Sequence, residues 1–197
     1  MNRIEQKEKR REEILAAGLN LFIRKGYAAT KTLDISQAAG ISEGLLFHYF
    51  ETKEKLYEEL IRIGISGPQS LMNNIEGEAL HFFQTAAKEI FHYIETVPFV
   101  AKMFVLMKQA EYNDAAPESV KKLLANRENF AFSVEKIREG QKSGTIRKGD
   151  PAALALAFWG AVQSIAEQAV LLPENPLPDS EWIVDIIRNK KEKGVKI

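Results

Sequence analysis

The chain contains no cysteine among its 197 residues and only three histidines. Disulfide cross-links, thiolate nucleophiles and cysteine-ligated metals are therefore excluded. His81 and His92 are eleven residues apart, which is about 16 Å along one helix and too far for a shared metal ion. We interpret them as residues that edge the core or line a pocket, and we expect no metal site.

Sequence motifs that support catalysis are also missing. The chain has no G-x-S-x-G sequence, no phosphate-binding P-loop and no G-x-G-x-x-G dinucleotide fingerprint. Its histidines have no nucleophile at a spacing that suits a catalytic pair. The sequence therefore predicts a protein that is not an enzyme, with no catalytic residues and no cofactor.

Signals for membrane insertion and export are weak. No apolar run approaches the ~18 residues that a membrane-spanning helix needs. The first residues, M-N-R-I-E-Q-K-E-K-R-R-E-E, carry too many charges for a secretory signal peptide. We therefore expect a cytoplasmic protein that does not interact with membranes.

The chain lacks an excess of positive charge, because 27 Lys and Arg residues balance 27 Asp and Glu residues. This balance counts against nucleic-acid binding. The first eleven residues are more basic, with Arg3, Lys7, Lys9, Arg10 and Arg11 against Glu5 and Glu8. A modest number of phosphate contacts per subunit is enough if two subunits bind together, since each neutralised phosphate adds to the affinity.

Helical periodicity runs through the chain, and no segment alternates as a strand does, so we predict an all-α fold. The first helix ends near residues 25–26 and buries apolar residues at three- and four-residue spacing. These residues are Ile14, Ala17, Gly18, Leu21 and Phe22. The next helices are short and begin at hydroxyl caps: Thr30 for a helix through Ala39, Ser42 for a third helix and Thr52 for a fourth.

The remaining sequence predicts longer helices. Residues 63–77 are rich in Gly, Ser and Pro and mark a boundary or bend. Helices are expected after it over residues 78–96, 99–112, 117–143, 151–172 and 179–193. We assign residues 1–50 to a DNA-binding domain, a three-helix bundle with a helix-turn-helix. Residues 51–197 are assigned to a helical domain for effector binding and dimerisation.

The stretch T-K-T-L-D-I-S-Q-A-A-G-I-S-E-G-L-L-F-H-Y-F-E-T-K-E-K-L, residues 30–56, is the most informative part of the chain. Small residues around Gly40 suit two helices that cross steeply at a turn. The apolar residues Ile35, Ile41, Leu46 and Phe50 then face the first helix. That arrangement exposes Glu43, Gly44, Leu45, Phe47, His48 and Tyr49 toward base edges in a major groove.

Cations and hydroxyls at the helix starts predict phosphate contacts, because free backbone N–H groups there favour anions. Lys53 opens the fourth helix, and Thr30, Lys31 and Thr32 lie at the start of the second. The sequence therefore combines base-reading and phosphate-binding positions in one short segment. A helix-turn-helix shape that never touches DNA is the alternative, and for single side chains such as Leu45 and Phe47 inward packing is a further alternative.

This segment resembles the N-terminal signature of the TetR family of bacterial transcriptional regulators, which has a Thr cap, D-I-A, A-G-V-S, L-Y-x-Y-F and S-K-E-x-L. The resemblance covers about a quarter of the chain. It implies that Thr30, Lys31, Ser42, Tyr49 and Lys53 hold phosphates while the exposed residues of the third helix face bases. A looser resemblance, over residues 138–159, is to the turn and following helix near the C-terminal dimer helices of many family members.

Three positions depart from the family pattern. Phe47 stands where Tyr is usual, Ser36 where Ala is usual, and Glu43 where a basic residue is common. Glu43 either accepts a hydrogen bond from cytosine N4 or merely repels phosphate, and the sequence leaves both readings open.

The family resemblance also implies a pocket for a small molecule, whose identity the sequence does not give. Aromatic and other bulky residues supply candidate lining, although such residues are more often plain core. The candidates are Phe83, Phe91, Tyr93, Phe99, Met103, Phe104, Met107, Phe130, Trp159 and Gln163.

The last two helices are predicted to form a homodimer. Residues 153–172 present Ala157, Gly160, Ala161 and Ser164 on one side, which allows close helix approach, and an ordinary buried helix is the alternative. A symmetric dimer is expected because two helix-turn-helices then reach half-sites ~34–36 Å apart on double-stranded DNA.

Together these features predict a repressor that occupies a palindromic operator and is released by a small, largely apolar effector. The main alternative is a helix-turn-helix architectural protein or activator without an effector. A helical interaction module or enzyme on an inherited scaffold is a third class.

Overall fold

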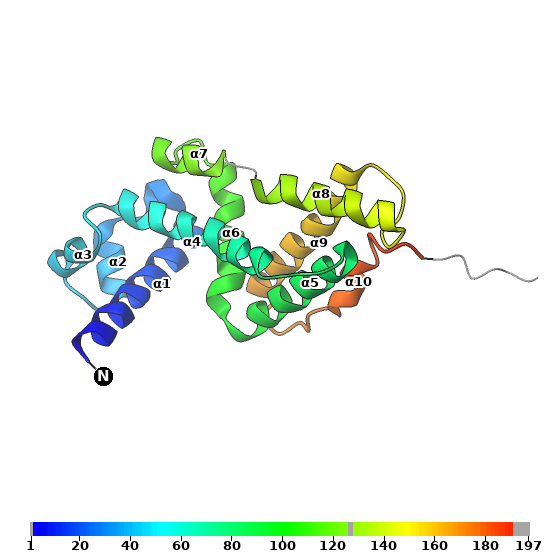
Figure 1. The fold of residues 1–197 in the computed structure, drawn as a ribbon. Coiled ribbons are helices and arrows are strands. Elements are labelled where there is room, and N and C mark those ends of the chain that lie inside the picture. Colours follow the sequence, from blue (N-terminus) through cyan, green and yellow to red (C-terminus); the bar gives the residue numbers. More distant parts are fainter. Residues whose placement is uncertain (1, 126–127, 191–197) are drawn as a thin grey trace, which may run out of the picture. The chain divides into compact units, whose positions relative to one another are not determined.

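The computed structural model describes residues 2–125 and 128–190. These residues are mostly helical (Figure 1), and the one β pairing among them is an isolated antiparallel bridge between Ile146 and Arg188. The all-α prediction is therefore confirmed. The helices are α1 (Arg3–Ala29), α2 (Thr32–Ala38), α3 (Glu43–Tyr49), α4 (Lys53–Asn73), α5 (Ala79–Thr96), α6 (Pro98–Glu111), α7 (Glu118–Leu124), α8 (Glu128–Ser143), α9 (Pro151–Leu171) and α10 (Ser180–Val184).

The chain divides into two compact units, each built from two stretches of sequence. The first unit, Met1–Gly67 with Phe99–Asn126, contains α1 to α3, most of α4, α6 and α7. The second unit, Pro68–Pro98 with Arg127–Ile197, contains the end of α4 and the helices α5, α8, α9 and α10. The first division falls inside the segment 63–77 where the composition predicted a boundary. The functional division at residue 50 stays a prediction.

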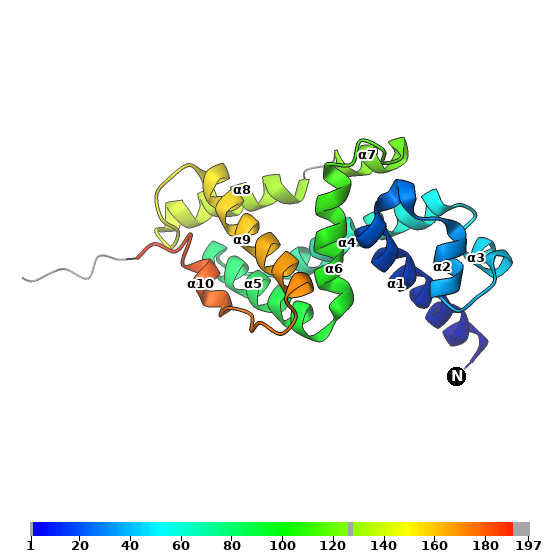
Figure 2. The same cartoon turned by 180° about the vertical axis from the view of Figure 1, so that it is seen from behind.

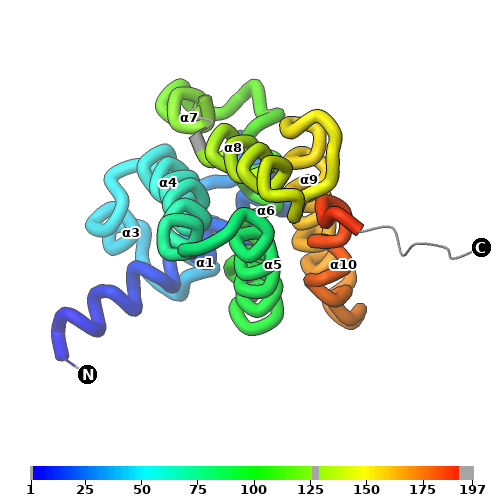
Figure 3. Tube along the Cα trace, turned by 45° about the vertical axis from the view of Figure 1, so that its right-hand side comes forward, coloured from blue at the N-terminus to red at the C-terminus, as the bar shows by residue number. Residues whose placement is uncertain are grey.

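The first unit is organised around α1, whose buried apolar residues share one core with residues of α4 and α6. Figure 3 traces α1 from the N-terminus toward α4. Phe22 is 1% exposed and its ring meets Tyr57 edge-on at 4.9 Å between centroids. Leu60 and Ile61 of α4 and Leu106 of α6 complete this centre, all at 1% exposure or less. Of the predicted first-helix residues, Ile14, Ala17, Gly18 and Phe22 are buried and Leu21 is half-buried.

The predicted end of the first helix appears as a break inside α1. Gly26 has φ 77° and ψ 164°, a conformation that is essentially open only to glycine. The chain resumes a helical path for the next few residues and leaves it at Thr30. The glycine signal was therefore correct about where regular helix stops, and a last distorted turn follows it.

In the second unit, α5 packs against α8, α9 and α10 (Figure 2). Aromatic residues fill the contact: Phe83 meets Phe158 at 4.9 Å between ring centroids, and both are fully buried. Apolar positions at helical spacing along α5 thus form part of the core of the second unit.

The segment 63–77 is more helical than its composition indicated, because α4 continues through Gly64 and Pro68 to Asn73. Gly64 serves close packing, since a Cβ atom there would collide with the Sδ atom of Met107. Pro68 has no N–H to donate to the carbonyl four residues earlier, so the helix lacks one of its backbone hydrogen bonds at that point.

Two other helix predictions were too long. The span 117–143 is divided into α7 and α8, with Ala125 closing α7. The last helix was predicted over 179–193, yet α10 ends at Val184, and residues 191–193 lie outside the described ranges. The backbone after α10 pairs with the loop between α8 and α9 instead of continuing as helix. Arg147 N–H donates to Ile187 O at 2.9 Å, and Asn189 N–H donates to Thr145 O at 3.0 Å.

The composition of α9 comes closer to that of a membrane-spanning helix than the lack of a long apolar run indicated. Among the described residues, α9 has the length and mean hydropathy of a span, and only 22% of its apolar window is buried. Core and interface helices of other proteins share these properties, so the length and hydropathy of α9 do not identify it as a membrane span.

Candidate nucleic-acid interface

The helices α2 and α3 are joined by a tight turn that follows directly from local sequence. Gly40 adopts φ 65°, and the Ile41 N–H donates to the Ser36 carbonyl at 2.9 Å across the turn. The Ser42 hydroxyl accepts from the Leu45 N–H at 3.2 Å, which confirms its role as the cap of α3. The Thr52 hydroxyl caps α4 in the same way through the Lys55 N–H.

The inner side of this pair is locked to the core of the first unit. Ile35, Leu46 and Phe50 are 0%, 2% and 6% exposed, and Ile41 packs beside them. These are the residues predicted to face the first helix, so the amphipathic reading of the motif is confirmed. With the inner face fixed, the outward face of α3 is determined by the helical period.

The outward face carries the residues predicted to meet bases. Leu45 and Phe47 are 39% and 44% exposed, although leucine and phenylalanine usually lie inside proteins. Gly44 and His48 are also exposed, while Glu43 and Tyr49 are half-buried. At the start of α2, Lys31 is exposed and Thr32 is half-buried, and the Thr32 hydroxyl donates to Glu43 Oε1 at 2.8 Å. The fold thus brings these positions together on adjoining surfaces.

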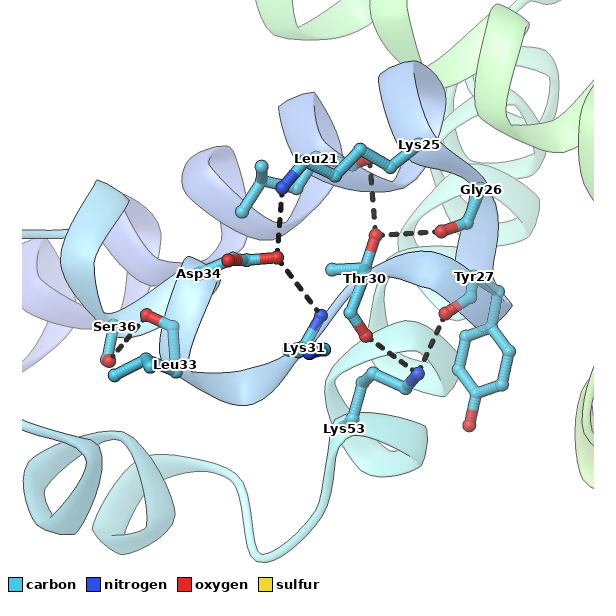
Figure 4. Close-up of polar contacts among 10 residues, drawn as sticks. All are labelled: Leu21, Lys25, Gly26, Tyr27, Thr30, Lys31, Leu33, Asp34, Ser36 and Lys53. Carbon is cyan, nitrogen blue, oxygen red and sulfur yellow. Dashed lines mark hydrogen bonds and ion pairs between the residues drawn. The ribbon is translucent and has the colours of Figure 1, made fainter.

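Thr30 takes a different place from the predicted one. Its side chain is 1% exposed, and its hydroxyl donates to the Gly26 carbonyl at 2.7 Å (Figure 4). It therefore closes the distorted last turn of α1, and the prediction that it caps the second helix is wrong. The cap residue of α2 is Lys31, whose N–H donates to the carboxylate of Asp34 at 3.4 Å. The same carboxylate accepts from Lys25 Nζ at 2.9 Å.

Asp34 and its lysine partner were missed by the sequence reasoning. The hydrogen bond from Lys25 and the Lys31 N–H together hold the pKa of Asp34 below its ordinary value of 3.8. An acidic residue at the third position of a helix is one half of the capping-box pattern, so this signal was available in the sequence.

Lys53 is tied to the end of α1. Its Nζ donates to the carbonyls of Tyr27 and Thr30, both at 2.8 Å, and lies 4.3 Å from the centroid of the Tyr27 ring (Figure 4). Burial lowers the pKa of its ammonium below the ordinary value of 10.5. The side chain predicted to hold a phosphate is thus engaged inside the protein in this structure.

A groove of about 960 Å³ runs between the first turns of α1 and the outer side of α3. Leu45, His48 and Tyr49 of α3 form one wall. The α1 wall carries four basic and two acidic side chains, namely Arg3, Lys7, Lys9, Arg10, Glu8 and Glu13. The basic N-terminal segment seen in the sequence therefore lies beside the outward face of α3.

The residues predicted to line an effector pocket are divided between the two units. Phe99, Met103, Phe104 and Met107 of α6 belong to the first unit, and the other six belong to the second. In the second unit Phe83 and Phe91 are buried, Tyr93 is 43% exposed, and Phe130 and Gln163 are half-buried. The remaining one, Trp159, donates its indole N–H to Ser133 Oγ at 3.0 Å. In the described residues no three His, Asp or Glu side chains are placed to hold a metal ion.

Two short helices with a glycine turn, a buried inner face and an exposed outer face beside basic residues define a helix-turn-helix DNA-binding protein. Residues 14–60 match the family model described as bacterial regulatory proteins, tetR family. This segment is therefore a TetR-family DNA-binding domain, and the relatives that match over most of the chain are HTH-type transcriptional regulators.

Three known proteins are similar to the chain over different shares of its length. It is 28% identical to the uncharacterized HTH-type transcriptional regulator YvkB of Bacillus subtilis over 77% of this chain and 78% of that one. It is 43% identical to the HTH-type transcriptional repressor KstR2 of Rhodococcus jostii over 28% of each chain. The structure of AibR in complex with isovaleryl coenzyme A and operator DNA has a similar fold, with a TM-score of 0.69, 19% identity and coverage of 89% of this chain and 94% of that one.

Proposed function

We propose that this chain is a cytoplasmic repressor, which binds a palindromic operator as a homodimer and is released by a small, largely apolar effector. The observation that carries the DNA-binding part is the outward face of α3, where Leu45 and Phe47 remain exposed and a groove separates the helix from a wall with more basic than acidic side chains. Exposed apolar side chains on a fixed helix suit contact with base edges and thymine methyl groups, while the basic residues suit phosphates.

The proposed contacts follow the exposure of each side chain. Glu43, Gly44, Leu45, Phe47 and His48 face bases, and Lys31, Ser42 and Tyr49 contact phosphates or sugars. The Thr32 hydroxyl is engaged with the Glu43 carboxylate and makes no phosphate contact of its own. Arg3 and Lys7 extend the phosphate surface along the groove. Thr30 and Lys53 donate to backbone carbonyls at the end of α1. We therefore propose that they stabilise the junction of α1, α2 and α4 and do not contact DNA.

The proposed dimer uses α9 and α10. The exposed side of α9 carries the small residues Ala153, Ala157, Gly160 and Ser164, together with Leu156 at 65% exposure. On α10, Trp182 is 67% exposed. An apolar surface with small residues at helical spacing permits close approach of a second copy, and covering it removes apolar area from water.

The effector is proposed to act through α4, because this helix is shared by both compact units. Its missing hydrogen bond at Pro68 makes the helix easier to bend there than elsewhere. An apolar molecule that inserts among the aromatic residues of the second unit would shift α4 and alter the separation of the two α3 helices in the dimer. AibR, of similar fold, was solved with isovaleryl coenzyme A and operator DNA, which supports a fold that accepts both DNA and a ligand.

Selection of bound sequences from a random duplex pool tests the DNA-binding proposal. The wild-type protein is expected to enrich a palindrome, and Phe47→Ala is expected to lose at least about tenfold in affinity for it, as for an apolar contact worth roughly 1.4 kcal/mol or more. Phe132→Ala is the matched control, because Phe132 on α8 is 42% exposed against 44% for Phe47. Equal affinity of both variants and the wild type would contradict the assignment of α3.

The repressor proposal is separated from the alternative by a reporter gene with the enriched palindrome next to its promoter. Repression requires reporter activity to fall when the protein is present and to return when an effector is added. An architectural protein or activator without an effector would bend DNA or raise reporter activity and would show no ligand whose addition weakens operator binding.

A further inference from the structure

The side chains on α3 restrict which bases this helix can read. Residues Glu43–Tyr49 read E-G-L-L-F-H-Y and contain no Arg, Lys, Asn or Gln. Arg and Lys are the common partners of guanine, and Asn and Gln are those of adenine. The polar group that remains at the start of the helix is the carboxylate of Glu43, which can only accept hydrogen bonds.

The carboxylate of Glu43 is held in one direction. The Thr32 hydroxyl donates to Oε1 at 2.8 Å, and this contact links the first residue of α2 to the first residue of α3. Thr32 is β-branched, so its own side chain has few alternative conformers. A carboxylate has about four acceptor positions, and the bond to Thr32 uses one of them. Glu43 therefore keeps acceptor positions for a second donor while its orientation is already fixed.

We propose that Glu43, oriented by Thr32, specifies a cytosine in each operator half-site by accepting a hydrogen bond from its N4 amino group. This inference rests on the proposed function, in which α3 enters the major groove. The chemistry of the groove selects cytosine because guanine and thymine present acceptors there, which a carboxylate repels. Adenine presents a donor beside the N7 acceptor, so it is also less favourable than cytosine.

The proposal has a different consequence from simple repulsion of phosphates. Repulsion would weaken binding to all duplexes equally, because phosphates carry no sequence information. A base contact changes the preferred base at one position in each half-site and leaves the others as they were. Thr32 is a positioning residue in this scheme, so its loss relaxes the preference without removing DNA binding.

The experiment compares sequences selected from a random duplex pool by the wild type, Glu43→Gln, Thr32→Val and Thr32→Ser. Wild type is expected to require cytosine at one position of each half-site, with a preference of about fivefold or more over other bases. Glu43→Gln is expected to prefer adenine at that same position, since a carboxamide can pair with N6 and N7. Thr32→Val is expected to accept several bases there, and Thr32→Ser, which keeps the hydroxyl, to restore cytosine.

The outcomes separate this inference from the function on which it rests. If the wild type enriches no palindrome, the proposed function fails first and takes the inference with it. If the wild type enriches a palindrome but Glu43→Gln enriches the same bases at every position, the proposed function stands and the cytosine contact is refuted. A general gain in affinity for all duplexes in Glu43→Gln, with unchanged base preference, would identify Glu43 as a repelling charge only. Circular dichroism of each variant checks that α3 remains folded.

Discussion

Two lysines near α2 illustrate how neighbouring residues of one type serve different purposes. Lys31 is exposed at the start of α2, whereas Lys53 donates to the Tyr27 and Thr30 carbonyls at the end of α1. Both were predicted to hold phosphates from their place at helix starts. The structure distinguishes them, because a side chain that satisfies two backbone acceptors inside the protein contributes first to stability.

Replacement by glutamine is therefore expected to change stability at Lys53 and the salt dependence of DNA binding at Lys31. Lys53→Gln should lower the free energy of unfolding by about 1–2 kcal/mol, since charge-assisted hydrogen bonds to two carbonyls are lost at a partly exposed site. Lys31→Gln should leave stability unchanged and reduce the salt dependence of operator binding by about one phosphate contact per subunit. Urea unfolding and operator affinity at several salt concentrations measure both quantities. A stable Lys53→Gln protein that loses only salt dependence would restore the phosphate role of Lys53.

Glu58 contributes a pH dependence to stability. Its side chain is 10% exposed, and hydrogen bonds from Arg62 at 2.6 Å and Lys55 at 3.1 Å hold its pKa below the ordinary value of 4.5. The folded state therefore binds a proton more weakly than the unfolded state does. The stabilisation is complete above pH 4.5 and is lost as the pH falls from there through the folded-state pKa.

Glu58→Gln should accordingly flatten the loss of stability below pH 4.5. At neutral pH the cost is expected to be about 1 kcal/mol or less, because both partners are largely exposed. Melting temperatures between pH 3 and pH 7, roughly the range in which carboxyl groups titrate, provide the measurement. Glu12→Gln, at an exposed position of α1, controls for the loss of one negative charge. If the melting temperature of Glu58→Gln falls as steeply below pH 4.5 as that of the wild type, Glu58 and its two partners do not cause the pH dependence.

At the scale of helices, the sequence predicted those features that depend on neighbours in the chain. The turn at Gly40, the cap at Ser42 and the buried face with Ile35 and Leu46 all follow from residues within about two turns of one another. Such local signals are carried by backbone preference, capping and periodicity, and these act before tertiary packing is complete. This explains why the DNA-binding motif was located from sequence alone.

The features that were missed depend on partners far away in the sequence. Lys53 bonds to residues 23 and 26 positions earlier. The end of α10 depends on a backbone pairing between Ile146 and Arg188. Gly64 leaves room for Met107 of α6, because a Cβ atom at position 64 would collide with the Sδ atom of that side chain. No local pattern encodes these contacts, so composition suggested a bend at Gly64 and a longer last helix.

The break in α1 gives a prediction at this scale. Gly26→Ala is expected to destabilise the protein by about 1–3 kcal/mol, because a side chain strains the backbone at φ 77° and ψ 164°. Gly44→Ala is the control, since Gly44 lies in a helix with open space around it and alanine there favours helix by about 0.5–1 kcal/mol. Urea midpoints should therefore move in opposite directions, and a stabilising effect of Gly26→Ala would contradict the strained geometry.

At the scale of the whole molecule, balanced charge and DNA binding are compatible because the charges are placed unevenly. The groove beside α3 has more basic than acidic side chains, although the chain as a whole is neutral. A single copy with few phosphate contacts binds weakly, and two copies held together double those contacts. The function proposed for the chain therefore depends on its dimer.

A charge placed on the proposed dimer surface tests that dependence. In a two-fold interface each residue occurs twice around the axis, so one substitution introduces two like charges into an apolar contact. Leu156→Glu is expected to yield monomers, because Leu156 is 65% exposed on the small-residue side of α9. Tyr112→Glu, at a site that is 74% exposed in the first unit, adds the same charge and should remain dimeric.

Sedimentation velocity measures the oligomeric state, and operator binding measures the consequence. The Leu156→Glu monomer should bind one half-site with about half the salt dependence of the dimer, because the slope of log affinity against log salt counts the phosphates neutralised together. Its stability should match that of the wild-type monomer, since the substituted side chain is exposed within its own chain. Dimers that persist in Leu156→Glu would move the interface away from α9, and full operator affinity of a monomer would remove the need for two copies.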